Sequence, residues 1–340
     1  MANPIGSVLA SPDTLNHFYN GLHDIFMNVF SNHSNATTRS WIKRKFYQMP
    51  FTGNYEVAQG WFAVPVPEPF VRGAGLTDDG FDEFTYTLYV HDYRTPRLKW
   101  HINDLNDSRA PMSMKTRAED AGRELAKYME YVIVGLLTAS VGQYLHPNTS
   151  FTTPLGSSSL FNASHTYNGQ TLNNIVITGG VTIGAISSAY WRIRKAFSNM
   201  LTSNGRPYWN RDEETEVRWD IWIPVALEEQ FNIVSRGSMV ALNGGTAPST
   251  NVTMDVFGNK TELHVLELLT SATDFYVFRE TNNDGMKPFV EGNRLDIERK
   301  QWTRFDSDWS KKTHEEGIQW WMRKAYGSGV PFTAVKGAAA

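Results

Sequence analysis

The sequence predicts an α+β fold that is organised around one long helix. Residues 112–144 carry apolar or small side chains at three-and-four spacing, which forms one apolar stripe along a helix. Apolar and polar residues alternate at 84–90, as they do in a half-buried strand, and the alternation at 217–223 also predicts a strand. At about 1.5 Å per residue the helix extends roughly 40 Å, so we expect it to be the spine of the fold. The stripe consists of Ala118, Ala121, Leu125, Tyr128, Val132, Ile133 and Leu136.

Length and composition exclude several classes of protein. The 340 residues are enough for two or three folding units, and 41% hydrophobic with 20% charged residues is typical of a globular chain. The net charge of −3 gives no reason to expect general affinity for nucleic acid or anionic membranes. The absence of cysteine excludes disulfides and cysteine metal sites. No segment reaches the roughly 18 apolar residues of a membrane helix, so we expect no membrane partner.

The N-terminal region predicts a helical arm followed by a basic cluster. Residues 13–30 carry a helical apolar stripe that ends in the polar run 31–35. Four basic residues then alternate with Trp41 and Phe46. Such a cluster either faces DNA phosphates or forms salt bridges, and the second role is the commoner one. The basic cluster is Arg39, Lys43, Arg44 and Lys45.

Residues 55–94 predict a long β-hairpin. The segment is rich in glycine, proline and aromatic residues, and the prolines of 64–67 confine that strand to a sheet edge. The return strand is 84–90, and the tip lies near 72–82. A two-stranded hairpin of this length cannot build its own core and is marginally stable alone in water. We therefore expect it to lie on a neighbouring surface.

Helices and strands follow one another around the spine. Ser113 is placed to cap the start of the spine helix, and Gly142 and Pro147 are placed to end it. The other elements that we expect are strands at 98–102, 217–223, 263–269 and 275–278, helices at 182–201 and 227–234, and a strand-like, tryptophan-rich end after residue 290.

The sequence contains no convincing catalytic template. The triplet 314–316, His-Glu-Glu, lacks the second histidine of a zinc-protease helix and predicts a surface turn. The glycines of 179–184 fit neither the dinucleotide-binding nor the Walker spacing. The acidic run 212–216 is typical of a solvated loop. We therefore expect a protein that is not an enzyme, with no catalytic residue, no cofactor and no metal.

Aromatic residues leave one alternative function open. They make up 13% of the chain, and four tryptophans lie near the C-terminus. Aromatic platforms stack on sugars, so a soluble carbohydrate-binding or carbohydrate-active β protein is conceivable. Aromatics spread over a whole chain more often anchor cores and large interfaces, which is the interpretation that we favour. The four are Trp302, Trp309, Trp320 and Trp321.

The order of these elements resembles a known family. An arm helix, a long hairpin, a strand and a spine helix precede a helix–strand–helix–strand region and a returning sheet. This order, over roughly residues 50–325, resembles the major capsid proteins of tailed double-stranded DNA phages, which have the Johnson or Hong Kong 97-like fold. Within that group the chain looks most like the Mu-type major head subunit. The supporting stretches are 86–109, the spine helix, 160–165 and 222–228.

The resemblance implies a division of the chain into parts. The hairpin tip would be an assembly contact between subunits, through Arg72, Gly73, Gly75, Asp78 and Asp79. The implied parts are an N-terminal arm (1–50), an extended β-hairpin loop (51–95), a peripheral domain with the long spine helix 112–144 (96–175), an axial domain (176–285), and a return to the peripheral domain with a C-terminal tail (286–340).

The resemblance also implies a function and partners. The chain would be a structural subunit that self-assembles into hexamers and pentamers, forming the icosahedral head around the double-stranded DNA genome of a tailed phage. We expect non-specific packaged DNA, a separate scaffolding protein, a portal and a decoration or cement protein as partners. The protein would reside in the virion capsid after assembly in the bacterial host cytoplasm. An encapsulin-like nanocompartment shell is the alternative with the same fold.

Overall fold

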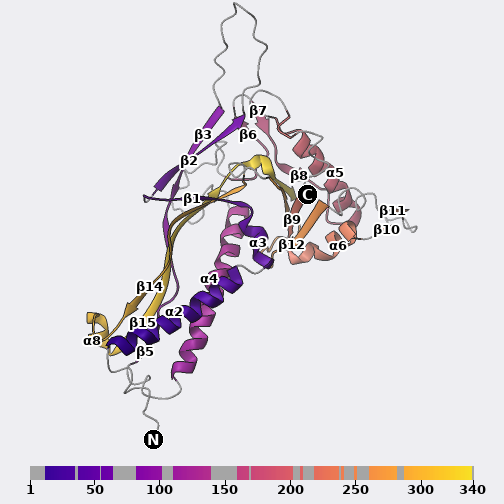
Figure 1. The fold of residues 1–340 in the computed structure, drawn as a ribbon. Coiled ribbons are helices and arrows are strands. Elements are labelled where there is room, and N and C mark those ends of the chain that lie inside the picture. The colour runs from indigo at the N-terminus through magenta and orange to yellow at the C-terminus, as the bar shows by residue number, and fades with distance from the viewer. Residues whose placement is uncertain are drawn as a thin grey trace, which may run out of the picture.

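The computed structural model shows an elongated molecule built on two sheets (Figure 1). The long sheet runs beside two helices, and the compact sheet lies at one end of it, partly covered by two further helices. The residues that the structure describes are 12–34, 37–53, 55–63, 82–101, 110–138, 159–167, 170–201, 207–209, 218–236, 239–240, 249–250, 260–281 and 287–338.

The long sheet is built around two long antiparallel strands near the C-terminus. Strand β14 (Phe289–Trp302) pairs with β15 (Glu315–Ser328), and register shifts near Leu295 bend the pair. Strand β1 (Phe46–Pro50) adds parallel to β14. Strands β4 (His91–Arg94) and β5 (Leu98–His101) both pair antiparallel with β15. The helix α8 (Asp308–Thr313) connects β14 to β15.

Two helices pack along the long sheet and form the larger hydrophobic core with it. Helix α2 (Pro12–Ser34) lies against α4 (Ala110–Thr138), and the short helix α3 (Thr37–Lys43) follows α2 (Figure 1). The ring of Phe26 stacks on Trp320 with centroids 4.1 Å apart, which joins α2 to β15. The spine helix is confirmed, and its predicted stripe faces this core, with Ala118, Leu125, Val132, Ile133 and Leu136 buried.

The spine helix begins two residues before the predicted start at residue 112. Helix α4 begins at Ala110, so Ser113 lies inside the first turn and is not the cap. Pro111 favours the earlier start, because proline tolerates the first turn, where its missing N–H has no helical partner. Residues 139–144, the predicted end of the spine, lie outside the described residues.

The compact sheet has the strand order β12-β9-β13-β16-β8. Helices α5 and α6 cover one of its faces, and the aromatic side chains of the other face belong to the larger core. Strands β9 and β13 are buried on both faces, and β9 confirms a strand within the predicted range 217–223. The elements are β8 (Ile175–Ile177), α5 (Ile183–Ser198), β9 (Trp219–Ile223), the 3-10 turn η3 (Val225–Leu227), α6 (Glu228–Arg236), β12 (Thr261–Val265), β13 (Phe275–Arg279), the 3-10 turn η6 (Pro331–Thr333) and β16 (Ala334–Ala338).

The predicted hairpin is present as a separate two-stranded sheet. Strand β2 (Tyr55–Ala63) pairs antiparallel with β3 (Asp82–Tyr89), and among the described residues neither joins the two larger sheets (Figure 1). Two other small pairs complete the described strands. They are β6 (His165–Tyr167) with β7 (Gln170–Leu172), and β10 (Met239–Val240) with β11 (Ser249–Thr250).

Strand pairing crosses three of the part boundaries expected from the sequence. Strand β1 belongs to the long sheet, although residues 1–50 were assigned to the arm. Strand β4 also belongs to the long sheet, although 51–95 was assigned to the extended loop. Strand β16 lies inside the compact sheet, between β13 and β8, although 286–340 was assigned to the peripheral domain. The long sheet therefore includes strands from the N-terminal part of the chain, and the last strand of the chain belongs to the compact sheet.

The contact between α2 and α4 predicts an unusual effect of alanine. A Cβ atom at Gly122 would lie 2.8 Å from the backbone oxygen of Phe26 and 3.3 Å from the backbone nitrogen of Phe30. We expect Gly122→Ala to lower the free energy of unfolding by about 1–3 kcal/mol, because α2 must move away. Gly21→Ala is the matched control, since nothing lies within 4 Å there, and it should raise stability by about 0.5–1 kcal/mol. Urea unfolding measures both, and a stabilising Gly122→Ala would contradict this packing.

Candidate functional site

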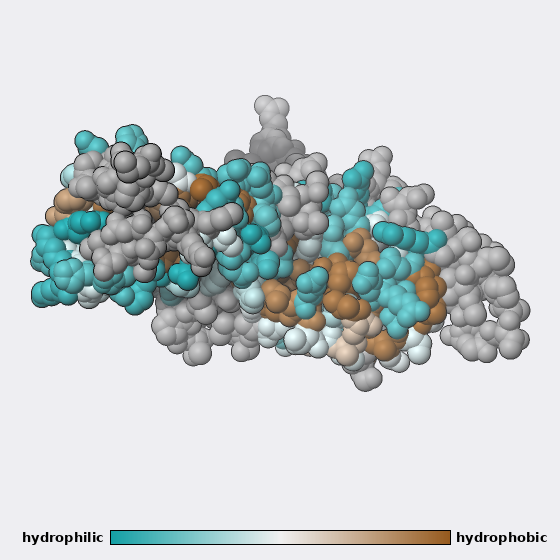
Figure 2. Space-filling model, turned by 90° about the horizontal axis from the view of Figure 1, so that it is seen from below, coloured by the Kyte–Doolittle hydropathy of each residue, from teal (hydrophilic) through white to brown (hydrophobic). Residues whose placement is uncertain are grey.

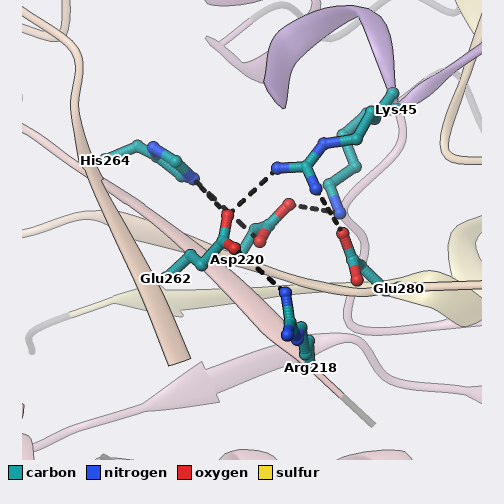
Figure 3. Close-up of polar contacts among 7 residues, drawn as sticks. Lys45, Arg218, Asp220, Glu262, His264 and Glu280 are labelled. Atoms are coloured by element: carbon teal, nitrogen blue, oxygen red, sulfur yellow. Dashed lines mark hydrogen bonds and ion pairs between the residues drawn. The ribbon is translucent and has the colours of Figure 1, made fainter. Parts of the chain in front are cut away.

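A cluster of seven charged or titratable side chains lies where the two sheets meet (Figure 3). We call it the charged junction. Two of its members, Arg44 and Lys45, form the turn between α3 and β1, so they belong to the chain that enters the long sheet. The others come from the compact sheet or its flanks and are Arg218, Asp220, Glu262, His264 and Glu280.

The centre of the junction is a buried ion pair. The ammonium group of Lys45 binds Oδ2 of Asp220, and the two side chains are only 4% and 0% exposed. Asp220 is the second residue of β9, a central strand, so its carboxylate is held by the sheet itself. Removing one partner of a buried pair leaves an uncompensated charge, which is strongly destabilising. The pair therefore fixes the start of β1 to the middle of the compact sheet.

A partly exposed ring of ion pairs surrounds this pair. Arg44 donates to Glu262 at 3.0 Å and to Glu280 at 3.1 Å, so one guanidinium bridges the β12 strand and the end of β13. Arg218 lies 3.6 Å from Glu262 on the other side. Burial opposes ionisation of Glu262, but the hydrogen bond and charge of Arg44 outweigh it and lower the pKa of that carboxyl. These pairs are more exposed than Lys45–Asp220, so each contributes less.

His264 lies between the two carboxylates and is held by stacking. Its Nε2 lies 3.6 Å from Glu262 and 4.0 Å from Asp220, and its side chain is 15% exposed. The ring stacks on Trp41 with centroids 4.1 Å apart and planes 11° apart. Burial lowers the pKa of His264 to about 4; Glu262 opposes this shift, whereas Arg44 and Lys45 add to it. The imidazole is therefore neutral at pH 7.

The junction also contains the donor atoms of a metal site, but its cations already occupy them. One ligand atom each of Asp220, Glu262 and His264 lies within 4.8 Å of the others. Lys45 binds the first carboxylate and Arg44 binds the second. A divalent ion would have to displace both side chains from their partners. The arrangement therefore fits a structural network of ion pairs better than a metal centre.

The basic cluster predicted from the sequence is divided by the structure. Arg44 and Lys45 bind carboxylates of the compact sheet, and Lys45 is too deeply buried to contact DNA. Lys43 is half-buried; burial lowers its pKa and Lys324 adds to this, whereas Glu291 opposes it. Arg39 lies in α3, and its side chain lies outside the described residues. A DNA contact by Arg39 or Lys43 stays a prediction.

The predicted hairpin tip lies outside the described residues. This holds for all five assembly residues, so their role also stays a prediction: Arg72, Gly73, Gly75, Asp78 and Asp79.

The C-terminal tryptophans take part in packing. Trp320 is fully buried against α2. The guanidinium of Arg97 lies over the rings of both Trp302 and Trp309, 4.0 and 4.7 Å from their centroids. Trp321 has Arg94 over its ring at 5.9 Å. Cations and core residues therefore cover ring surfaces that a sugar platform would need.

The triplet at 314–316 is not simply a surface turn. His314 ends α8 with a left-handed backbone (φ 54°), as a turn residue would. Glu316, however, is fully buried in β15 and accepts a 2.7 Å hydrogen bond from Nε of Arg304. Sequence reasoning missed this residue because its partner is twelve positions away, across the β14–β15 connection.

The buried pair gives the first prediction for the junction. Lys45→Met should lower the free energy of unfolding by about 3–5 kcal/mol, because Asp220 is left charged and unpaired. The double variant Lys45→Met/Asp220→Leu should recover most of this loss. Lys127→Met is the matched control, since that lysine pairs with Glu124 at 3.1 Å on an exposed helix face, and it should cost less than about 1 kcal/mol. Equal losses for the two single variants would contradict the buried pair.

His264 gives the second prediction. Its folded pKa of about 4 lies below its ordinary value of 6.5, so the unfolded chain binds more protons between these values. The neutral ring therefore adds stability above pH 6.5, and this contribution is lost as the pH falls through 4. We expect His264→Gln to flatten the pH dependence of unfolding free energy in that window by up to about 3 kcal/mol. The same pH dependence of the unfolding free energy in wild type and variant would show that the ring of His264 protonates as freely in the folded chain as in the unfolded chain.

The comparisons with known proteins identify the fold. No protein-family model and no curated protein matches the sequence. Among solved structures, the chain is similar to the capsid of an empty GTA particle, with TM-score 0.54, 11% identity, and coverage of 89% of this chain and 90% of that one. Among the described residues, no helix is long and apolar enough to span a membrane.

Two phage structures give the same result. The mature capsid of bacteriophage PhiM1 matches with TM-score 0.52 and 9% identity, covering 88% of this chain and 86% of that one. The structure of Microbacterium phage Oxtober96 matches with TM-score 0.51 and 12% identity, covering 88% and 90%. Similarity at this level of identity establishes the fold. The chain has the α+β, Hong Kong 97-like fold found in phage capsids, which confirms the fold predicted from the sequence.

Proposed function

We propose that this protein is the major capsid protein of a tailed phage, a structural subunit that self-assembles into an icosahedral shell. The observation that carries the proposal is the extent of the fold similarity. In each of the three similar structures, two of which are described as capsids, the shared fold covers more than four fifths of both chains. The arm helix, hairpin, spine helix and both sheets are therefore parts of one subunit design rather than additions to an unrelated enzyme. The proposed role is structural and not enzymatic.

The hairpin supports the proposal on physical grounds. Strands β2 and β3 pair with each other, and a two-stranded sheet alone in water is marginally stable. Tyr55 at its base is 58% exposed although its ring lies 5.8 Å from Tyr89. A second copy of the chain is the natural source of the missing cover, because symmetric assembly repeats each such contact in every subunit.

The proposed parts of the subunit follow the two sheets. The long sheet with α2 and α4 would form the peripheral domain, and the compact sheet with α5 and α6 would form the axial domain at the capsomer centre. In this proposal β1 and β4, which pair within the long sheet, would belong to the peripheral domain, and β16, which pairs within the compact sheet, would belong to the axial domain. The hairpin would be the extended loop, with its tip in contact with an adjacent subunit.

The finer features of the proposal come from the resemblance in sequence pattern. The subunit would form hexamers and pentamers around double-stranded DNA and would be most like the Mu-type head subunit. Its partners would be a separate scaffolding protein, a portal, a decoration or cement protein, and packaged DNA bound without sequence preference. Assembly would take place in the bacterial host cytoplasm. The nucleic acid content of purified native particles distinguishes this function from an encapsulin-like shell, which would contain protein cargo.

The hairpin tip provides the test of the proposed function. Deleting residues 72–80 should leave a folded subunit and abolish closed particles, because the intersubunit contact is lost while both cores stay intact. A variant with the same residues replaced by glycine and serine shows whether loop length alone is sufficient. Circular dichroism reports the fold, and sedimentation with negative-stain microscopy reports the particles. Normal shells from the deletion variant, or a wild-type protein that stays monomeric, would contradict the proposal.

A further inference from the structure

The two edges of the compact sheet carry opposite chemistry. The strand order places β8 at one edge and β12 at the other. Helix α5 packs over β8 and β16, whereas α6 packs over β12, so each helix belongs to one edge (Figure 1). Three of the large hydrophobic side chains that are exposed in this structure lie at these edges: Ile177, Trp191 and Val225.

The β8–α5 edge is apolar and basic. Ile177 is 53% exposed and Trp191 is 41% exposed. Helix α5 contains three basic residues and no acidic residue. Arg192 donates through Nη1 to the backbone oxygen of Ile177 at 2.6 Å, which holds its positive charge beside the exposed isoleucine. The basic residues are Arg192, Arg194 and Lys195.

The η3–α6 edge is apolar and acidic. Val225 in η3 is 54% exposed. Glu228 and Glu229 follow it within one turn and are both exposed. Glu267 is exposed and lies near this edge. Its position follows from its neighbour Leu266, whose N–H donates to the backbone oxygen of Ile223, two residues before Val225. Figure 2 shows hydrophobic residues gathered with hydrophilic ones on the underside of this half of the molecule.

Four of the charged residues at these edges form no ion pair within the described part of the chain. Lys195, Glu228, Glu229 and Glu267 form no ion pair among the described residues, in contrast to the charges of the junction. Isolated exposed apolar residues are common, but here they coincide with basic residues at the β8–α5 edge and with three acids at the η3–α6 edge, where Arg236 at the end of α6 is the one exposed base of that helix. Such matched patches steer association and fix the orientation of partners.

We propose that the β8–α5 edge of one subunit binds the η3–α6 edge of a second copy of this chain. The inference rests on the proposed function and names the contact within a capsomer. The two edges are different surfaces of one molecule, so their contact is head-to-tail, and repeated head-to-tail contacts close into a ring when the rotation allows it. Ile177, Trp191 and Val225 supply the apolar centre, and the basic and acidic side chains supply the orientation.

Charge reversal with rescue tests the contact. Arg192→Glu/Lys195→Glu places acids opposite acids, and Glu228→Lys/Glu229→Lys places bases opposite bases. We expect each double variant to stay folded by circular dichroism and to yield at least about tenfold fewer closed particles in sedimentation, because like charges meet. The combined four-residue variant restores opposite charges and should recover particle yield. Lys311→Glu/Lys312→Glu in α8, exposed and remote from both edges, is the matched control and should assemble normally.

The outcomes separate this contact from the proposed function. Wild-type shells together with normal shells from both reversed variants would overturn the contact and leave the capsid function standing. Folded reversed variants that are not rescued by their combination would also overturn it. Wild-type protein that forms no shell under any condition would instead contradict the capsid function.

Discussion

The buried pair between Lys45 and Asp220 is the interaction on which the arrangement of the two sheets depends. Lys45 directly precedes β1, and Asp220 lies in the middle of the compact sheet. A backbone hydrogen bond also joins Lys45 to β14. The N–H of Phe289, the first residue of β14, donates to the backbone oxygen of Lys45. Lys45 thus connects the first strand of the long sheet, the start of β14 and the buried strand β9 of the compact sheet. Trp41 and His264 then seal the pair from solvent by stacking.

The two sheets are also joined by shared hydrophobic cores. The compact sheet uses one face for its own core with α5 and α6. Trp222, Tyr276 and Phe278 on the other face belong to the core of α2, α4 and the long sheet. The sheets therefore share apolar surface over a wide area, and hydrophobic burial is not directional. The ion pair between Lys45 and Asp220 is directional, so it favours one relative orientation of the two sheets. Its formation requires the desolvation of two charges.

The sequence predicted periodic elements well and long-range partners poorly. The spine helix, α5 and the hairpin were predictable, because each shows its own period or turn signal. The complete burial of β9 was not, because Trp219, Ile221 and Ile223 alternate with residues whose cover comes from elsewhere in the chain. Lys45 appeared as one member of a surface cluster, since its partner lies far along the sequence. The close approach at Gly122 likewise depends on α2, so no local pattern signals it.

The buried charges of the junction and the exposed charges of the two edges have different physical consequences. Ions at the centre of the junction are shielded from solvent, so salt screens them little and the two sheets keep one relative orientation. Charges at the β8–α5 and η3–α6 edges are exposed, so the contact proposed between these edges would be individually weak and sensitive to salt. The proposed shell would need this division, because a misplaced subunit must dissociate before the particle closes. Strong contacts inside the subunit and weak, repeated contacts between subunits would let errors be corrected while the closed shell stays stable.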